Sequence, residues 1–377
     1  MTGRCVLCGK QSRLVAESLG LCADCIREKP EHSRPLIIES HAKARRVFGL
    51  PAQPPRSNRG IPCNICSHEC RMGEGEVGYC GLRRNVQGKL VSTVSLEKAL
   101  LHAYLDPQVT NCCAAWFCPA GTGAGYPKYA CQEGPETGYY NLALFFYACN
   151  FNCLFCQNIS HKELDVAEET TVDQLVNRTV ENDRISCWCF FGGSPEPQLP
   201  FAINASRSMV EASPEDRILR ICFEWNGCGN PRLVERAAKI ALKSGGNIKF
   251  DLKCFNPNLS LALSGVDNSS AYANFKMVYG RFYNERPDLP VLTATTLMVP
   301  GYVDAEEVDK ISSSIASLDE SIPYSLLVFF PHFMMRDLPV TPIEQVKECY
   351  QAARKHLKRV NVGNLNLLAG TPFKSVF

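Results

Sequence analysis

The sequence predicts an α/β fold, in which a partial barrel of six β/α units follows small cysteine-rich metal-binding modules. From residue 142 onwards, apolar runs typical of buried strands alternate with helix-like stretches. Such alternation implies a parallel sheet with right-handed crossovers. The cysteines are unevenly placed, since 15 of the 21 lie before residue 157. We therefore divide the chain into a four-cysteine module with its linker (1–58), a second cysteine-rich module with a glycine-rich segment (59–140), and the partial barrel with a C-terminal helix and tail (141–377).

Composition and charge narrow the class of protein. The chain has 377 residues, enough for a full-sized core, and its net charge of +2 is too balanced to favour nucleic acid or an anionic membrane as a partner. No apolar run approaches the ~20 residues that a membrane-spanning helix needs, and the first residues lack a signal-peptide pattern. We therefore expect a cytoplasmic protein. Thiols stay reduced there, so clustered cysteines are more often metal ligands than disulfides.

Six apolar runs predict the strands of the barrel, a number that fits a partial barrel better than a closed eight-stranded one. They lie at residues 142–147, 187–191, 219–225, 247–252, 291–298 and 326–330. Helices are predicted between and after them at 172–180, 231–243, 305–318 and 342–357. Asp304 and Thr341 precede the last two helices and are suitable N-caps. Before the barrel we expect a helix at 36–48, a strand at 89–95 and a helix at 96–105.

The first cysteine module contains two Cys-x2-Cys pairs with thirteen residues between them. The pairs are Cys5 with Cys8 and Cys22 with Cys25. This spacing is a strong signature of a zinc site, and the metal would supply the folding energy that so short a segment cannot obtain from apolar burial. Four thiolates leave no open coordination position, which argues against catalysis. A rubredoxin-like iron or an iron–sulfur cluster is the competing occupant.

The second cysteine module has the spacing Cys-x2-Cys-x3-Cys-x9-Cys. Its members are Cys63, Cys66, Cys70 and Cys80, and the glycines before the last cysteine suit tight turns around a metal. These four residues could bind zinc or an auxiliary iron–sulfur cluster, and the spacing does not decide between them. His68 could be a further ligand, although a histidine in such a place is more often a neighbour of the metal site.

A glycine-rich segment with four more cysteines precedes the barrel. Cys112, Cys113, Cys118 and Cys131 surround the glycines of residues 121–125. The segment lacks the Lys-Ser/Thr ending of a P-loop, which excludes that mode of nucleoside triphosphate binding. We expect a tight-turning loop packed against the barrel mouth. The alternative is that some of these cysteines ligate a further cluster or line the substrate site.

A three-cysteine loop leaves the first predicted strand of the barrel. Cys149, Cys153 and Cys156 have the spacing Cys-x3-Cys-x2-Cys. A four-iron cluster needs four ligands, usually cysteine thiolates, so three local cysteines leave one iron open to a ligand that is not protein. The alternatives are a zinc site or buried thiols, but a three-cysteine loop with no fourth ligand nearby is a poor closed zinc site.

Glycines and charged residues follow the later strands at the end where β/α barrels carry their function. Each is weak evidence alone, because a lone charge is usually solvated and a Gly-Gly pair is usually a turn. In order after the cysteine loop they form one candidate cofactor site, which consists of Gly192, Gly193, Glu196, Glu224, Asn226, Asp251 and Lys253. We assign no catalytic residue from the sequence.

The cysteine loop and these strand ends resemble the radical SAM superfamily, in particular its pyruvate formate-lyase activase-like branch. Gly192 and Gly193 stand in a segment similar to the Gly-Gly-Glu-Pro motif, with Ser194 where glutamate is usual, and Asp251-Leu252-Lys253 matches the Asp-Leu-Lys of that branch. The resemblance covers about residues 130–340. It implies that the three cysteines hold a [4Fe-4S] cluster that chelates S-adenosyl-L-methionine, and that the strand-end residues bind this cofactor.

The resemblance also implies a reaction. A reduced cluster would cleave S-adenosylmethionine to a 5′-deoxyadenosyl radical, which abstracts hydrogen in the post-translational modification of a protein or peptide, with a low-potential electron donor as second partner. The cysteine modules with this barrel look like the cobalamin-dependent glutamine C-methyltransferase of methyl-coenzyme M reductase, although the Asp-x-His-x-x-Gly cobalamin signature is absent from the sequence. The alternatives are a glycyl-radical-enzyme activase and a non-catalytic iron–sulfur or zinc protein.

Overall fold

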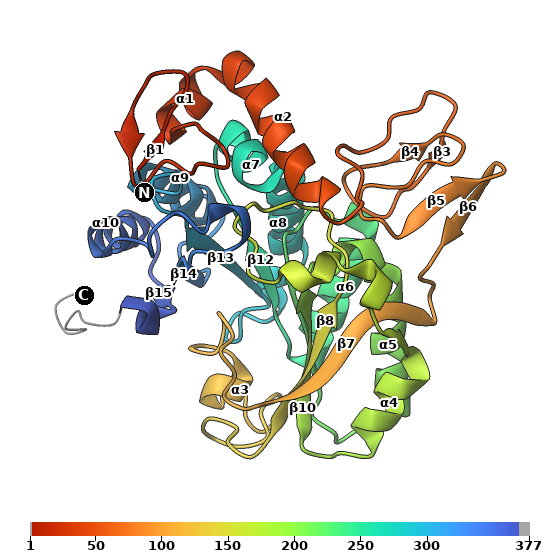
Figure 1. Ribbon diagram of the computed structural model, residues 1–377. Coiled ribbons are helices and arrows are strands. Elements are labelled where there is room, and N and C mark those ends of the chain that lie inside the picture. Colours follow the sequence, from red (N-terminus) through yellow and green to blue (C-terminus); the bar gives the residue numbers. More distant parts are fainter. Residues whose placement is uncertain (1, 369–377) are drawn as a thin grey trace.

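A nine-stranded sheet forms the centre of the computed structural model, which describes residues 2–368 (Figure 1). Its strands are β7 (Lys98–Pro107), β8 (Tyr140–Phe146), β9 (Glu169–Thr171), β10 (Ile185–Gly192), β11 (Arg220–Trp225), β12 (Ile248–Asp251), β13 (Leu292–Met298), β14 (Tyr324–Val328) and β15 (Val360–Gly363). They lie in the order β15-β14-β13-β12-β11-β10-β8-β7-β9. All pairs from β8 to β15 are parallel, whereas β7 is antiparallel to both of its neighbours. The fold is the predicted α/β partial barrel.

The six predicted barrel strands are confirmed as β8 and β10 to β14. A seventh parallel strand, β15, was not predicted, because its four residues carry only two apolar side chains, Val360 and Val362. The predicted strand at 89–95 corresponds to β6 (Lys89–Ser92), which forms a hairpin with β5 (Arg83–Val86).

The predicted helix at 96–105 is wrong, because that segment forms most of strand β7. A short apolar run is ambiguous between helix and strand when only its periodicity is read. Pairing decides the matter here: β7 forms a continuous antiparallel register with β8 from Leu101 opposite Phe146 to Pro107 opposite Tyr140.

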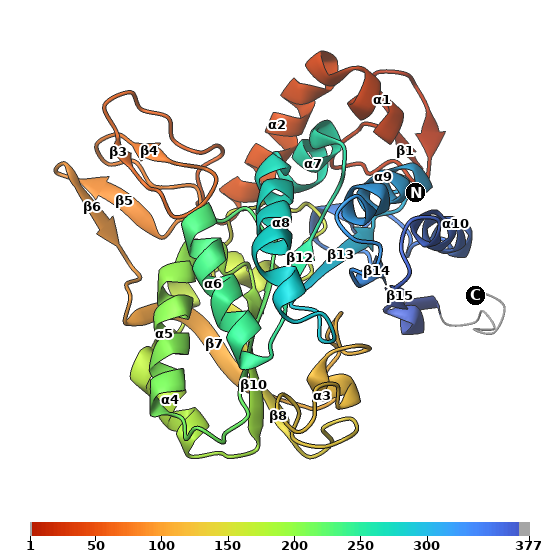
Figure 2. The same cartoon turned by 180° about the vertical axis from the view of Figure 1, so that it is seen from behind.

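Helices cover the outer side of the sheet, so that they stand in front of the strands in Figure 2. They are α4 (Val172–Val180), α5 (Leu199–Ala212), α6 (Pro231–Ser244), α7 (Pro257–Ser264), α8 (Ser269–Phe282), α9 (Ala305–Ala316) and α10 (Ile343–Arg354). The four helices predicted in the barrel are confirmed as α4, α6, α9 and α10.

One of the two predicted N-caps is confirmed. Asp304 accepts a hydrogen bond from the backbone N–H of Glu307 at the start of α9. Thr341 does not cap α10, because Pro342 occupies the N-cap position. Its hydroxyl instead accepts from Phe329 N and donates to Met298 O, both at 2.8 Å, and thereby joins two strand-end loops.

Strand alternation separates the core beneath the helices from the inner face of the barrel. Phe146, Phe190 and Phe223 on three adjacent strands stack at 5.8 and 5.1 Å between ring centroids, and Phe201 of α5 packs on Phe146. Because successive side chains of a strand point to opposite faces, the residues next to these aromatic rings point into the barrel.

Residues 2–46 lie at the carboxyl end of the parallel strands (Figure 1). They contain β1 (Gly3–Arg4), β2 (Gln11–Ser12), α1 (Ala23–Glu28) and α2 (Pro30–Arg46), which includes most of the helix predicted at 36–48. Tyr302 joins this segment to the barrel, since its hydroxyl accepts from Ala16 N at 2.9 Å and donates to Leu21 O at 2.8 Å. Arg27 adds an ion pair with Asp304 at 3.0 Å.

Residues 108–139, which include the short helix α3 (Pro119–Thr122), pack against the amino end of the parallel strands and not against the barrel mouth. The predicted location is therefore wrong. Strand β7 runs antiparallel to β8 and ends beside its first residue, so the chain leaves β7 at the opposite end of the barrel. The buried pair of Arg220 and Glu136, at 2.5 Å, fastens the segment there.

Among residues 2–368, no helix is long and apolar enough to cross a membrane.

Candidate active site

The three-cysteine loop follows β8 and is held by backbone hydrogen bonds from several directions. Asn152 N donates to Ser264 O at 2.8 Å, Leu154 N donates to Leu263 O at 2.9 Å, and Ala148 N donates to His161 O at 2.7 Å. Burial raises the pKa of the Cys149 thiol well above its usual value and that of Cys156 to about 11. Both thiols are therefore protonated until a metal displaces their protons.

The spacing of the three thiols suits a cluster better than a single ion. A tetrahedral zinc with Zn–S bonds of ~2.3 Å brings its sulfur ligands within roughly 3.8 Å of each other. In the part of the chain that the structure describes, Cys149, Cys153 and Cys156 do not form a group whose sulfur atoms all lie within 4.8 Å. Such wider spacing leaves room for several metal atoms between the thiolates.

A pocket of about 220 Å³ opens beside this loop at the carboxyl end of the strands. Nine of the ten residues predicted for the cluster and its cofactor line it, namely Cys149, Cys153, Cys156, Gly192, Gly193, Glu224, Asn226, Asp251 and Lys253. Residues that are distant in sequence thus converge from β8, β10, β11 and β12.

Glu196 is the exception, since it is fully buried and does not line the pocket. Its Oε1 accepts a hydrogen bond from Gly227 N at 2.7 Å. We therefore correct its predicted role from cofactor contact to support of the loop after β11. Burial raises its pKa to about 7, against an ordinary value of 4.5.

Gly192 and Gly193 let the ends of β8 and β10 approach each other. A Cβ on Gly193 would lie 2.0 Å from Ala148 O, and a Cβ on Gly192 would lie 2.7 Å from Phe146 N. Gly192 also has φ of +110°, in the region that favours glycine. The glycines are therefore needed because the backbone at the end of β8 and of the cysteine loop packs directly against them. This packing is present whether or not a cofactor is bound.

Asn226 connects three strand ends beneath the pocket. Its amide donates to Asn150 Oδ1 at 2.7 Å and to Ser194 Oγ at 3.0 Å, while its Oδ1 accepts from Cys228 N at 2.9 Å. Ser194, which replaces the usual glutamate of the resembling motif, is thus a partner of Asn226.

Two ion pairs include charged residues that line the pocket. Lys253 pairs with Asp251, and although burial lowers the pKa of Lys253, the charge of Asp251 and its hydrogen bond to the lysine raise that pKa more, so Lys253 is a cation. Lys249 lies 3.5 Å from Glu224.

Three further polar residues of the site were not singled out from the sequence: His161 and Asn364 line the pocket, and Lys162 contacts Asn152 of the cysteine loop. His332, which follows the sixth predicted strand, has its Nδ1 2.6 Å from Cys156 O. Lys162 is buried, and desolvation lowers its pKa to about 8. His161 and Lys162 lie only a few residues after Cys156, and this position in the sequence was the available signal for them. Asn364 follows strand β15, which was not predicted.

Three pocket-lining residues carry buried polar atoms with no partner among the described residues: Asp251 Oδ1, Trp225 Nε1 and His161 Nδ1. A buried polar group without a hydrogen bond costs about 1–3 kcal/mol, so such atoms suit a polar ligand that supplies the partners. With three thiols on one side and these atoms on the other, the residues present fit a cluster and a zwitterionic ligand such as S-adenosylmethionine.

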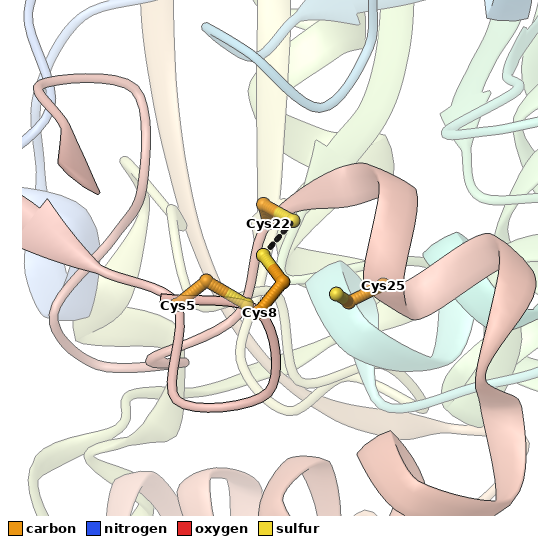
Figure 3. A group of neighbouring side chains, drawn as sticks. All are labelled: Cys5, Cys8, Cys22 and Cys25. Atoms are coloured by element: carbon orange, nitrogen blue, oxygen red, sulfur yellow. Dashed lines mark hydrogen bonds between the residues drawn. The ribbon is translucent and has the colours of Figure 1, made fainter. Parts of the chain in front are cut away.

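The first cysteine module has the geometry of a single-ion site. Figure 3 shows Cys5, Cys8, Cys22 and Cys25 turned toward one another, from the turn after β1 and from the start of α1. Their four sulfur atoms all lie within 4.8 Å of one another, with Cys8 and Cys22 at 3.8 Å.

The second module adjoins the three-cysteine loop. Its irregular chain contains β3 (Ile61–Pro62) and β4 (Arg71–Met72). His68 is buried, with Nε2 at 2.6 Å from Asn150 O and its ring 4.4 Å from that of Tyr79, and is thus a support of the loop. Within residues 2–368, no three of Cys63, Cys66, Cys70 and Cys80 have sulfur atoms all within 4.8 Å.

Comparison with known families gives one match, between residues 144–311 and the radical SAM superfamily. An uncharacterized protein of Methanocaldococcus jannaschii is 23% identical over 329 residues, which cover 81% of each chain. A second protein of that organism, named a glycyl-radical enzyme activating enzyme, is 20% identical over 225 residues, covering 58% of this chain and 79% of the relative.

Solved structures include more distant likenesses. SuiB of Streptococcus suis bound to S-adenosylmethionine is 12% identical with a TM-score of 0.43, and the match covers 60% of this chain and about half (50%) of SuiB. A domain of a pyruvate-formate lyase-activating enzyme from Bacteroides vulgatus is 16% identical with a TM-score of 0.36, covering 47% of this chain and 98% of that domain. The family match coincides with the strands that build the pocket. Residues 144–311 therefore form a radical SAM domain.

Proposed function

We propose that the chain modifies a residue of a protein or peptide by hydrogen abstraction at the pocket beside the cysteine loop. In this proposal Cys149, Cys153 and Cys156 would hold a [4Fe-4S] cluster, which, when bound and reduced by a low-potential donor, would supply the reductive cleavage of S-adenosylmethionine that yields a 5′-deoxyadenosyl radical. The observation that carries the proposal is the convergence of the three thiols with six strand-end residues in one pocket.

The side chains of the pocket have separable tasks. Lys253 and Asp251 offer opposite charges to the carboxylate and the amino group of the cofactor, and Asn226 holds the cysteine loop against β10. Phe151, Phe155 and Phe191 line the same pocket and exclude water. Exclusion of water protects a reactive intermediate from side reactions.

For the reaction itself we propose cobalamin-dependent C-methylation of a glutamine in methyl-coenzyme M reductase. Its support is the pair of cysteine modules joined to an activase-like barrel, and both modules lie near the carboxyl end of the strands. The described residues offer no cobalamin-binding signature, and residues 108–139 lie at the opposite end of the barrel. We therefore derive no step through cobalamin and leave its requirement to experiment.

A second candidate is a glycyl-radical-enzyme activase, in which a protein glycine loses the hydrogen. The relative of Methanocaldococcus jannaschii that carries an activating-enzyme name favours it. For the cysteine modules we propose zinc at Cys5, Cys8, Cys22 and Cys25, whose sulfurs have single-ion spacing, and an auxiliary cluster at Cys63, Cys66, Cys70 and Cys80, whose sulfurs are spread more widely.

The first test is formation of 5′-deoxyadenosine by anaerobically prepared protein with S-adenosylmethionine and a strong reductant. We expect turnover in the wild type, none in Cys153→Ala, and wild-type turnover in Cys349→Ala, whose cysteine is buried in α10 and does not line the pocket. An iron–sulfur carrier or zinc protein without catalysis would form no product in any of them.

Omission of methylcobalamin then separates the two reactions. We expect methyl transfer to a methyl-coenzyme M reductase peptide only when methylcobalamin is present. Methyl transfer that persists without it would contradict the methyltransferase proposal. A glycyl radical detected by electron paramagnetic resonance in a partner protein, without methylation, would favour the activase.

A further inference from the structure

The cysteines of the segment at the amino end of the barrel form a cluster that the proposed reaction does not use. Single donor atoms of Cys112, Cys113 and Glu224 all lie within 4.8 Å of one another. Apart from the first cysteine module, this is the only such group of three or more cysteine, histidine or carboxylate residues within residues 2–368. Cys112 and Cys113 come from the segment after β7, and Glu224 comes from β11.

Contacts of the backbone hold the two adjacent cysteines in place. Cys113 O accepts hydrogen bonds from Ser325 Oγ at 2.7 Å and from Trp116 Nε1 at 3.1 Å. Ser325 belongs to β14, so the inner face of the barrel fixes the position of the dithiol. Such anchoring restricts the donors before any ligand arrives, which lowers the ordering cost of binding.

Lys249 places a buried positive charge beside these donor atoms. Its side chain is 2% exposed, and its Nζ lies 3.5 Å from Glu224 Oε2, 3.1 Å from Cys112 Sγ and 3.2 Å from Cys189 Sγ. This positive charge would offset part of the negative charge that two thiolates and a carboxylate carry in a metal-bound site.

Space is also available beside the donors. A cavity of about 50 Å³ is lined by one of the three donors, Cys112, together with Cys189 and Lys249, and it is large enough for an ion or a water molecule. Glu224 in addition lines the pocket of the three-cysteine loop. The donor group therefore borders the pocket in which the radical is proposed to form.

We propose that Cys112, Cys113 and Glu224 form a further metal site for a thiophilic divalent cation such as Zn²⁺. On binding, two S–metal bonds and one O–metal bond form, each S–H bond still present breaks and its proton passes to solvent, and no oxidation state changes. Two thiolates and a carboxylate suit zinc, and three protein donors leave a fourth position for water or for a donor atom of a bound substrate.

Metal content is the first test. In protein reconstituted with iron, sulfide and Zn²⁺, the double variant Cys112→Ser/Cys113→Ser should hold about one zinc fewer per chain than the wild type, with unchanged iron. Cys349→Ser is the matched control, because that cysteine is buried in α10 outside the group, and it should retain the wild-type zinc content. Equal zinc in the double variant and the wild type would overturn the proposal.

A second test needs no variant and therefore survives misfolding of the double variant. Wild-type protein treated with a chelator is alkylated before and after addition of Zn²⁺ alone, and modified cysteines are mapped by mass spectrometry. We expect Zn²⁺ to protect Cys112 and Cys113 from alkylation. Alkylation of both residues at the same rate with and without Zn²⁺ would overturn the proposal. Neither test depends on 5′-deoxyadenosine formation, so the fate of the proposed reaction is decided separately.

Discussion

Glu196 shows how one buried carboxyl can support a site that it does not touch. It is fully buried, and its Oε1 accepts from Gly227 N, but its Oε2 has no partner among the described residues. Desolvation of the charged form raises its pKa to about 7 from an ordinary 4.5. The protonated side chain is thus the form that suits the folded protein.

This pKa predicts a pH-dependent stability. Because the folded pKa is raised, the contribution of Glu196 is fully present below pH 4.5 and is lost as the pH rises through 7. The shift corresponds to about 3 kcal/mol at most. Glu196→Gln cannot ionise, so its free energy of unfolding relative to the wild type should rise between pH 5 and pH 8, measured by chemical denaturation under anaerobic conditions.

A surface variant provides the control for this measurement. Glu215→Gln removes an exposed carboxyl, and its stability difference from the wild type should stay within about 0.5 kcal/mol at both pH values. A Glu196→Gln difference that is equal at pH 5 and pH 8 would contradict the assignment of a raised pKa.

At the scale of elements, the turn between β10 and the following helix is built around the cysteine loop. The loop after β8 and the Gly192-Gly193 turn share a backbone interface, in which Gly193 N donates to Phe146 O at 2.9 Å. No side chain can enter this interface without moving one of the two loops.

Gly193→Ala should therefore damage the cluster site. Its Cβ would lie 2.0 Å from Ala148 O and 2.8 Å from His161 Cγ, and relief of that overlap must shift the cysteine loop. We expect a loss of about 1–3 kcal/mol of stability, as for other overpacked sites, and severalfold less iron per chain after reconstitution, measured by metal analysis and by the visible absorption of the cluster.

The matched variant is Gly280→Ala in α8, where an added Cβ meets nothing within 4 Å. Alanine is the better helix former by up to about 1 kcal/mol, so this variant should be as stable as the wild type or more stable, with full iron content. Normal iron content in Gly193→Ala would contradict this prediction, because it would show that the cysteine loop can shift and still hold its iron.

On the scale of the whole molecule, the first cysteine module packs against the barrel through specific contacts. Arg27 of α1 pairs with Asp304 at the start of α9, and Tyr302 holds the backbone of residues 16 and 21. A metal that orders Cys5, Cys8, Cys22 and Cys25 therefore also positions the helix that bears Arg27.

Removal of this metal should destabilise both the first cysteine module and the start of α9. In Cys5→Ser/Cys8→Ser we expect a lower melting temperature, and faster amide hydrogen exchange in residues 2–28 and at the start of α9. Lys10→Ala, which breaks only the exposed ion pair with Asp24 in the same module, should change stability by less than about 1 kcal/mol. Unchanged exchange at α9 in the double variant would mean that the docking does not depend on the metal.

Part of this fold could be predicted from the sequence alone, and part could not. Apolar runs predicted β8 and β10 to β14, because each is long enough to be distinguished from its surroundings. β15 was missed because only two of its four residues are apolar, and β7 was mistaken for a helix because its run of apolar residues fits both periodicities. The error in β7 also placed residues 108–139 at the wrong end of the barrel.

The sequence by itself determined the chemistry: the spacing of Cys149, Cys153 and Cys156, and the kinds of residue at the later strand ends, are local properties that can be read in order along the chain. Only the tertiary structure decided which of them meet. It turned Glu196 away from the pocket, brought His161 and Asn364 into it, and set Cys112 and Cys113 beside Glu224. Strand pairing brings together residues that lie a hundred positions or more apart in the sequence, and no local pattern encodes that pairing.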